Sequence, residues 1–263
     1  MARKRVWLTW LPEESSPADI QGLVTLLGKS GLEVDGTPWN RDVAKAGWLE
    51  TAEVLAEPGR ADVWLIVGRR DDFQADAVRY GLSLAQVLLR AKRAAPLAML
   101  CAGLDGALAP EGMPMLLRDA AVAGAPSSTW GAKTIAAAMR PPPAAAPEPF
   151  RLSIIAHSSL GQWFEVGPAE SVWNGALFGV DAGEITHHGV GPQGLLPEHC
   201  TLEYPSMGLR IDAGGREFTC CAVKNRLGAG ESYFVRVTGM PSHILFGEHP
   251  EQDEAEVRIL DLL

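Results

Sequence analysis

The residue types that could support metal chemistry gather in the second half of the chain. All six histidines lie there, and the segment from Glu184 to His188 places an acid close to two imidazoles. We predict a strand here, on which Glu184 and His188 share a face, whereas the zinc motif HExxH requires a helix. Glu184, His188 and His199 therefore form a candidate metal site of a metal-dependent β-sandwich enzyme. The simpler interpretation is that these histidines lie on the surface and that no metal is bound.

Candidate nucleophiles have histidine neighbours in the sequence but no recognisable catalytic motif. Ser158 and Ser159 follow His157, and Cys200 follows His199. None of them has the strand, turn and helix context of a nucleophile elbow, and no acid is placed to orient the histidine. The four cysteines share no CxxC spacing, so we expect neither a zinc centre nor a disulfide framework.

Two further features of this half are predicted to be structural. Cys220 and Cys221 would alternate faces on a strand, so one is expected in the core and the other partly exposed. The glycine-rich run 189–194 has no helix after it that could concentrate positive charge on a phosphate. It is therefore expected to be a long loop.

A proline-rich run between Arg140 and Pro149 divides the chain into halves with different patterns. Proline lacks a backbone donor and fixes φ, so such a run neither continues a helix nor enters a sheet. We predict an α/β domain over residues 1–140, a spacer over 141–149 and a β-sandwich domain over 150–263.

Apolar runs alternate with segments of helical periodicity in residues 1–140. Strands are predicted near 5–11, 32–35, 61–68, 96–102 and 121–123, and helices near 17–28, 48–55, 80–93, 113–119 and 129–139. Alternating strands and helices imply right-handed crossovers and a three-layer open parallel sheet. The pattern is typical of a flavodoxin-like or TIR-like arrangement.

Ligands of such sheets bind at the loops that follow the strands. The loop after the first strand carries Glu13 and Glu14 but no glycine, so it cannot wrap a phosphate as nucleotide-binding loops do. We therefore expect no cofactor. Arg69 and Arg70 follow the third strand, where a phospho-accepting receiver would carry an aspartate. They are the candidate residues for binding an anionic ligand or the carboxylates of a partner.

The order of elements in this half resembles that of TIR domains. The resemblance implies NAD cleavage by a glutamate near the helix after the third or fourth core strand. The segment from Asp71 to Arg93 contains no glutamate, so Glu50 and Glu53, on the preceding helix, are the candidate substitutes. An NAD hydrolase that uses Glu50 or Glu53 is one alternative function, and a solvated helix face is the other interpretation of these two acids.

Short β-rich segments recur in residues 150–263 with glycine and proline between them. Strands are predicted at 150–156, 162–166, 172–180, 184–188, 200–204, 208–211, 217–223, 232–238, 243–247 and 255–260. This spacing is typical of an all-β sandwich. Two antiparallel sheets packed face to face are expected.

Charge and composition limit the partners that we expect. Residues 1–140 carry 16 basic and 16 acidic side chains, whereas residues 141–263 carry 7 and 16. An acidic second domain argues against nucleic acid or an anionic membrane as a partner. No apolar stretch approaches the roughly 18 residues that span a bilayer, and the apolar run near the N-terminus is too short for a signal peptide. We predict a cytoplasmic protein.

The functional prediction rests on the lack of a recognisable catalytic, nucleotide-binding or metal-binding motif in the sequence. We predict a non-catalytic, two-domain interaction or regulatory protein of the signalling type, with a protein partner or self-association. Its small-molecule ligand is not identified by the sequence. NAD hydrolysis and metal-dependent catalysis in the sandwich are the two alternatives.

Overall fold

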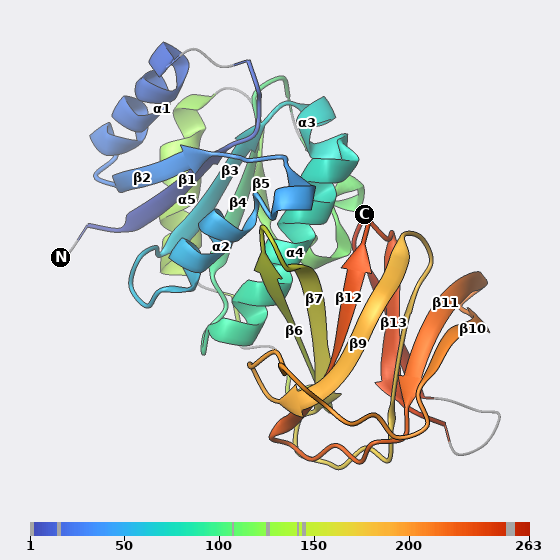
Figure 1. Cartoon of the computed structure of the whole chain (residues 1–263). Helices are drawn as coiled ribbons and strands as arrows, with labels where there is room; N and C mark the ends of the chain where they lie inside the picture. The colour runs from blue at the N-terminus through green and yellow to red at the C-terminus, as the bar shows by residue number, and fades with distance from the viewer. Residues whose placement is uncertain are drawn as a thin grey trace. The chain divides into compact units, whose positions relative to one another are not determined.

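The computed structural model describes residues 3–14, 17–106, 108–124, 127–140, 142–143, 146–250 and 256–263. The chain divides into two compact units, the first comprising Met1–Val43 and Gly47–Ala145 and the second Ala44–Ala46 and Ala146–Leu263 (Figure 1). In the predicted spacer, residues 141, 144 and 145 lie outside the described residues. The spacer residues that are described form neither helix nor strand.

The first unit is built on a parallel sheet, as predicted. Its described strands follow the order β2-β1-β3-β4-β5, which is a flavodoxin-like order. They are β1 (Arg5–Trp10), β2 (Glu33–Pro38), β3 (Val63–Gly68), β4 (Ala98–Gly103) and β5 (Ala121–Ala123). Every residue of β3 is buried, because helices cover both faces of a central parallel strand.

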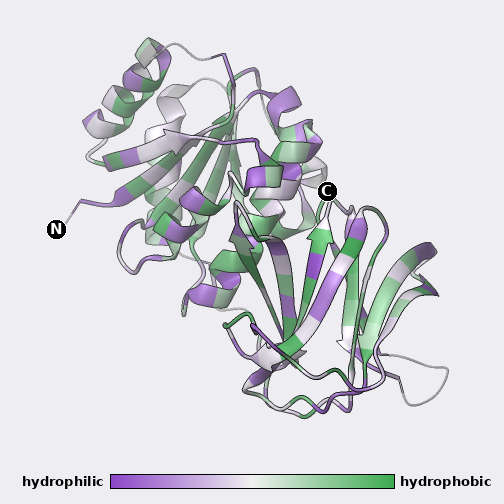
Figure 2. Ribbon diagram, viewed as in Figure 1, coloured by the Kyte–Doolittle hydropathy of each residue, from purple (hydrophilic) through white to green (hydrophobic). Residues whose placement is uncertain are grey.

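Helices flank the sheet on its two faces, and the central strands are hydrophobic (Figures 1 and 2). The helices are α1 (Pro17–Lys29), α2 (Leu49–Ala56), α3 (Arg70–Gln74), α4 (Asp76–Lys92) and α5 (Trp130–Met139). Leu27 of α1 and Trp130 of α5 share a core with Leu65 on one face. On the other face, where α2 and α4 pack together, the Trp64 indole N–H donates to the Thr9 hydroxyl over 2.8 Å. No helix among the described residues is long and apolar enough to cross a membrane.

One predicted helix of the first unit is wrong. Instead of a helix over 113–119, the chain forms only the short 3-10 turn Met115–Leu117. Pro114 immediately precedes this turn. Two arginine side chains of α4 hold the segment in place, since Arg79 donates to the carbonyl of Gly112 and Arg90 to that of Leu116.

The second unit consists of two antiparallel sheets, which confirms the predicted β-sandwich. Within the described residues their orders are β6-β7-β12-β9 and β10-β11-β8-β13-β14. The strands are β6 (Phe150–His157), β7 (Gly161–Pro168), β8 (Ala176–Val180), β9 (Glu184–Pro192), β10 (Ser206–Ala213), β11 (Arg216–Val223), β12 (Glu231–Thr238), β13 (His243–Glu248) and β14 (Val257–Asp261). Phe164 and Phe178 join the two sheets, with ring centroids 5.4 Å apart.

A segment between β9 and β10, residues 193–205, lies on the outer face of the four-stranded sheet, and we call it the strap. The prediction of a strand over 200–204 is wrong, because these residues belong to the strap. The prediction of a loop over 189–194 is also wrong for most of its length, since β9 extends to Pro192. Gly189 and Gly191 carry no side chains, so Pro197 of the strap can lie directly over them.

A buried carboxylate holds the start of the strap. Glu165 of β7 is only 4% exposed, and its Oε1 accepts the backbone N–H of Gly194 over 2.7 Å and the hydroxyl of Ser232 over 2.8 Å. A buried carboxylate is tolerated only when such donors replace its water. The Arg151 guanidinium also donates to Ser232, which places a positive charge next to this group.

The prediction that Cys220 or Cys221 would be partly exposed is wrong, because both are fully buried. Cys221 faces the other sheet, where its sulfur accepts the hydroxyl of Tyr233 at 3.0 Å. Cys220 faces the opposite way but belongs to a core cluster against which Ile211 and Ile259 of the two edge strands pack. Burial raises the pKa of each thiol to about 12, so both are neutral thiols near pH 7.

We expect Gly191→Ala to destabilise the second unit. The added Cβ would lie 3.0 Å from Cβ of Pro197, and overpacking of this kind costs about 1–3 kcal/mol. Urea titration measures the effect. Gly230→Ala is the matched control, because nothing lies within 4 Å of its added Cβ, and it should change stability by less than about 0.5 kcal/mol. Equal stability of the two variants would contradict close packing of the strap.

We expect the second unit to become less stable as the pH is lowered, because of His188. Its Nδ1 lies 2.6 Å from the hydroxyl of buried Tyr233, and burial lowers the pKa of His188 below its ordinary value of 6.5. The unfolded chain then binds a proton near pH 6.5 that the folded chain does not. The contribution is therefore fully present above pH 6.5 and lost as pH falls below it. Urea midpoints across this range should decline less steeply for His188→Gln, and parallel curves would contradict the assignment.

Candidate functional site

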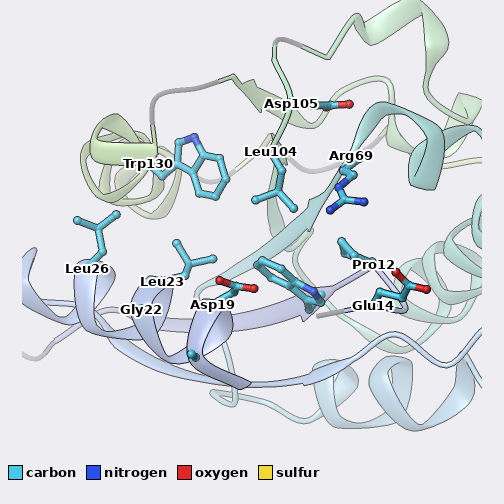
Figure 3. Close-up of a pocket in the computed structure, with 12 residues that line it drawn as sticks. Pro12, Glu14, Asp19, Gly22, Leu23, Leu26, Arg69, Leu104, Asp105 and Trp130 are labelled. Carbon is cyan, nitrogen blue, oxygen red and sulfur yellow. The ribbon is translucent and has the colours of Figure 1, made fainter. Parts of the chain in front are cut away.

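A cleft of about 550 Å³ opens on the α1 and α5 side of the parallel sheet, at the ends of β1, β3 and β4 (Figure 3). Its lining residues are Trp10, Pro12, Glu14, Ala18, Asp19, Gly22, Leu23, Leu26, Arg69, Leu104, Asp105 and Trp130. This volume is in the range of small-molecule sites, which are roughly 300–1,000 Å³. The cleft is the candidate functional site of the first unit.

The strand order explains why a cleft forms at this place. β1 lies between β2 and β3 in the sheet, so the chain leaving β1 crosses to one side and the chain leaving β3 crosses to the other. Loops that diverge from adjacent strands leave a crevice at their carboxyl ends, which is where open α/β sheets bind ligands. Trp10 ends β1, and Arg69 directly follows β3.

The inner part of the cleft is apolar and rigid. Trp10 and Trp130 are 6% and 1% exposed, and Leu23 of α1 is also buried. The Trp130 indole N–H donates to the carbonyl of Gly124 over 2.9 Å, which fixes its ring. A ligand would therefore meet preformed apolar surface, at little cost in side-chain entropy.

Arg69 brings a free positive charge to the rim. Its backbone N–H donates to Oδ2 of Asp72 over 2.8 Å, so the start of α3 is held in place. Its side chain is exposed and points into the cleft (Figure 3). Among the residues that the structure describes, the Arg69 guanidinium forms no ion pair, so its donors are available to a ligand.

Three carboxylates share this rim, namely Glu14, Asp19 and Asp105. Asp105 has a structural role, because its two oxygens accept the backbone N–H of Arg70 over 3.0 and 3.2 Å. Glu14 and Asp19 are exposed on the α1 side. The rim therefore carries more negative than positive charge and suits a ligand with a cationic nitrogen.

Arg41 fixes the two chain exits that form the cleft. One guanidinium nitrogen, Nη2, donates to the carbonyl of Leu11 over 2.7 Å and to Oδ1 of Asp72 over 2.6 Å. Its Nε lies 3.4 Å from Oε1 of Glu13. Since Asp72 also accepts the backbone N–H of Arg69, the exits of β1 and β3 are connected through one ion pair.

Only some of the predicted site residues of the first unit lie at the cleft. Arg69 lines the cleft, whereas Arg70 is exposed and takes part only through the backbone bond to Asp105. Glu50 and Glu53 are exposed on α2, which packs with α4 on the opposite face of the sheet. Neither glutamate lines the cleft.

The structure does not bring the candidate metal ligands Glu184, His188 and His199 together. The prediction that Glu184 and His188 share a face is wrong, because β9 has a bulge at Thr186: His187 pairs with Arg236 but Ile185 with Val237. The extra residue reverses the alternation, so Glu184 faces outward while His188 faces Tyr233 in the core. His199 is exposed on the strap. No group of three or more potential ligands occurs among the described residues.

The other histidine neighbours form no catalytic arrangement in the part of the chain that the structure describes. His157 Nδ1 lies 2.8 Å from the Ser159 hydroxyl, but this contact belongs to an exposed turn between β6 and β7. No acid among the described residues orients this imidazole. His199 and Cys200 are both exposed, and no bond between them occurs.

Sequence reasoning missed Trp10, Asp19, Asp105 and Trp130 as lining residues. Trp10 falls in the predicted strand 5–11, and Trp130 in the predicted helix 129–139. Their common signal is position, because each lies at the carboxyl end of a strand or in the first turns of a helix on one side of the sheet. No protein family matches this chain, and no curated protein matches it.

We expect Arg41→Met to destabilise the first unit by about 1–3 kcal/mol, since it leaves Asp72 and the Leu11 carbonyl without a charged donor. Urea titration provides the measurement. Arg60→Met is the control, because the ion pair of Arg60 with Asp35 is more exposed, and its loss should cost less than about 1 kcal/mol. A smaller effect at Arg41 than at Arg60 would contradict the role assigned to Arg41.

Proposed function

We propose that the protein is a non-catalytic, two-domain regulatory protein of the signalling type, whose α/β unit binds a small organic molecule in the cleft. The ligand class is an amine with an apolar or aromatic body. A protein partner or a second copy of the chain would respond to occupancy. The observation that carries the proposal is the cleft itself, in which an apolar interior adjoins a rim of Glu14, Asp19 and Arg69.

The chemistry of the lining supports binding rather than covalent catalysis. The described lining residues include no cysteine, histidine, serine or lysine, so they supply no nucleophile paired with a base. Carboxylates on the rim attract an ammonium group, and the free Arg69 guanidinium suits a carboxylate or carbonyl on the same ligand. An amine with an acidic group, such as an amino acid, would satisfy both charges.

Two further features support the proposed setting. The four cysteines are free thiols, which agrees with a reducing compartment such as the cytoplasm. The acidic excess lies in residues 141–263, which favours a protein partner over nucleic acid or an anionic membrane.

Binding should appear as thermal stabilisation of the full chain. The probes are L-phenylalanine, phenethylamine and the neutral 2-phenylethanol, each in excess. A ligand at one hundred times its Kd stabilises the folded state by about 2.7 kcal/mol, which raises Tm by several degrees. We expect the two amines to raise Tm and the alcohol to have no effect.

Arg69→Gln tests the carboxylate contact, and Arg70→Gln is the matched control. Both variants lose one exposed charge at the start of α3, but only Arg69 lines the cleft. The gain in Tm with L-phenylalanine should be lost in Arg69→Gln and kept in Arg70→Gln, while phenethylamine should act on both. The same response to L-phenylalanine in both variants, or none in the unmodified chain, would contradict the proposal.

A further inference from the structure

The outer face of the four-stranded sheet carries a second cluster of polar and aromatic side chains, independent of the cleft. Trp163 of β7 pairs with Arg236 of β12, which pairs with His187 of β9. Paired residues on adjacent strands lie on the same face, so these three side chains stand in one row. His157 pairs with Gly161 and, by alternation along β7, faces the same side as Trp163.

Arg236 is the unusual member of this row. Its Nε is buried and has no hydrogen-bond partner among the described residues. The rings of Trp163 and His187 come within 6.3 Å of each other, centroid to centroid, although β12 lies between their strands. They therefore flank Arg236 from both sides. No ion pair of the guanidinium occurs in the described part of the chain, so its charge and donors are not used within the fold.

The guanidinium of Arg236 lies close to Gly161, at the start of β7. Gly161 has a φ of 74°, and a Cβ added there would lie 3.2 Å from Nε of Arg236. A side chain at this position would therefore crowd the guanidinium. The Trp163 indole N–H donates to the carbonyl of Leu160 over 3.1 Å, which holds the ring beside this turn.

His157 adds a second donor to this face. Its Nδ1 accepts the backbone N–H of Ser159 over 3.2 Å, so in the neutral ring the proton is on Nε2. Glu184 lies on the same outer face, where it pairs with Thr238, one alternation beyond Arg236, and Glu165 lies on this face one alternation to the other side, beneath the strap. The strap contacts Gly189, Gly191 and Glu165, which lie in the neighbouring rows rather than in the row of Arg236.

We propose that Arg236, Trp163, His187 and His157 form a binding site for an aromatic oxyanion, in which a carboxylate or phosphate group is attached to a planar ring. The oxyanion would accept hydrogen bonds from the Arg236 guanidinium, a planar donor that matches either group. The ring would pack against Trp163. Unpaired buried donors are rare in folded proteins, and a bound oxyanion explains why Nε of Arg236 has no partner among the described residues.

The test is an NMR titration of the ¹⁵N-labelled full chain with benzoate, phenyl phosphate and benzyl alcohol. The signals observed are the Nε–H of Arg236 and the indole N–H of Trp163, assigned from Arg236→Gln and Trp163→Phe. We expect saturable shifts of both signals with at least one of the two anions and none with the alcohol. The anion with the lower Kd identifies whether the site prefers a carboxylate or a phosphate.

Arg236→Gln should weaken anion binding about tenfold or more, since it removes a charge-assisted bond. Arg216→Gln removes the same charge at an exposed hairpin and should bind as the unmodified chain does. If Arg236→Gln does not fold, Arg236→Lys gives the same test, because it keeps the charge but loses the planar donor pair. Shifts that do not saturate, that occur equally with benzyl alcohol, or that persist in the Arg236 variants would overturn the proposal.

Discussion

The contacts of one guanidinium determine the shape of the first unit's cleft. Arg41 joins the carbonyl of Leu11, at the exit of β1, to the carboxylate of Asp72, at the start of α3. Asp72 in turn accepts the backbone N–H of Arg69. The parallel sheet brings these exits to the same edge, but the sheet alone does not fix the loops. The Arg41 and Asp72 pair does so, because its charges are partly shielded from water at 23% and 14% side-chain exposure.

In the second unit, a segment of the chain is held in place by close packing against glycines rather than by an ion pair. Gly189 and Gly191 let the strap lie on the outer face of β9, and Glu165 beneath it binds the N–H of Gly194. One part of this face is therefore covered by the chain itself. The row of Trp163, Arg236 and His187 lies next to it on the same sheet, and there Nε of Arg236 has no hydrogen-bond partner among the described residues. Both proposed sites thus combine aromatic side chains with an arginine whose guanidinium forms no ion pair in the part of the chain that the structure describes.

Much of the fold could be predicted from the sequence because it depends on local patterns. The continuous apolar run of β3 indicates a strand covered on both faces, and the short alternating segments after residue 150 indicate antiparallel sheets. The failures have causes that periodicity does not contain. Segment 113–119 forms only a 3-10 turn, and backbone carbonyls in and just before it accept from Arg79 and Arg90. The strap occupies residues that have β propensity but no strand to pair with. Cys220 is buried in a cluster against which Ile211 and Ile259 of the two edge strands pack, so its burial depends on residues outside its own strand.

The sequence by itself determined the two kinds of architecture, the position of the boundary region between them and the place of Arg69 directly after the third strand. Apolar periodicity and proline content predict these features directly, because each pattern extends over only a few neighbouring residues. Only the tertiary structure decided which side chains meet. The bulge at Thr186 separates Glu184 from His188, and the order of the parallel strands brings Trp10, Asp19 and Arg69 around one cleft. Such juxtapositions depend on strand order and register, which arise from contacts between distant segments and leave no periodic signal in the chain.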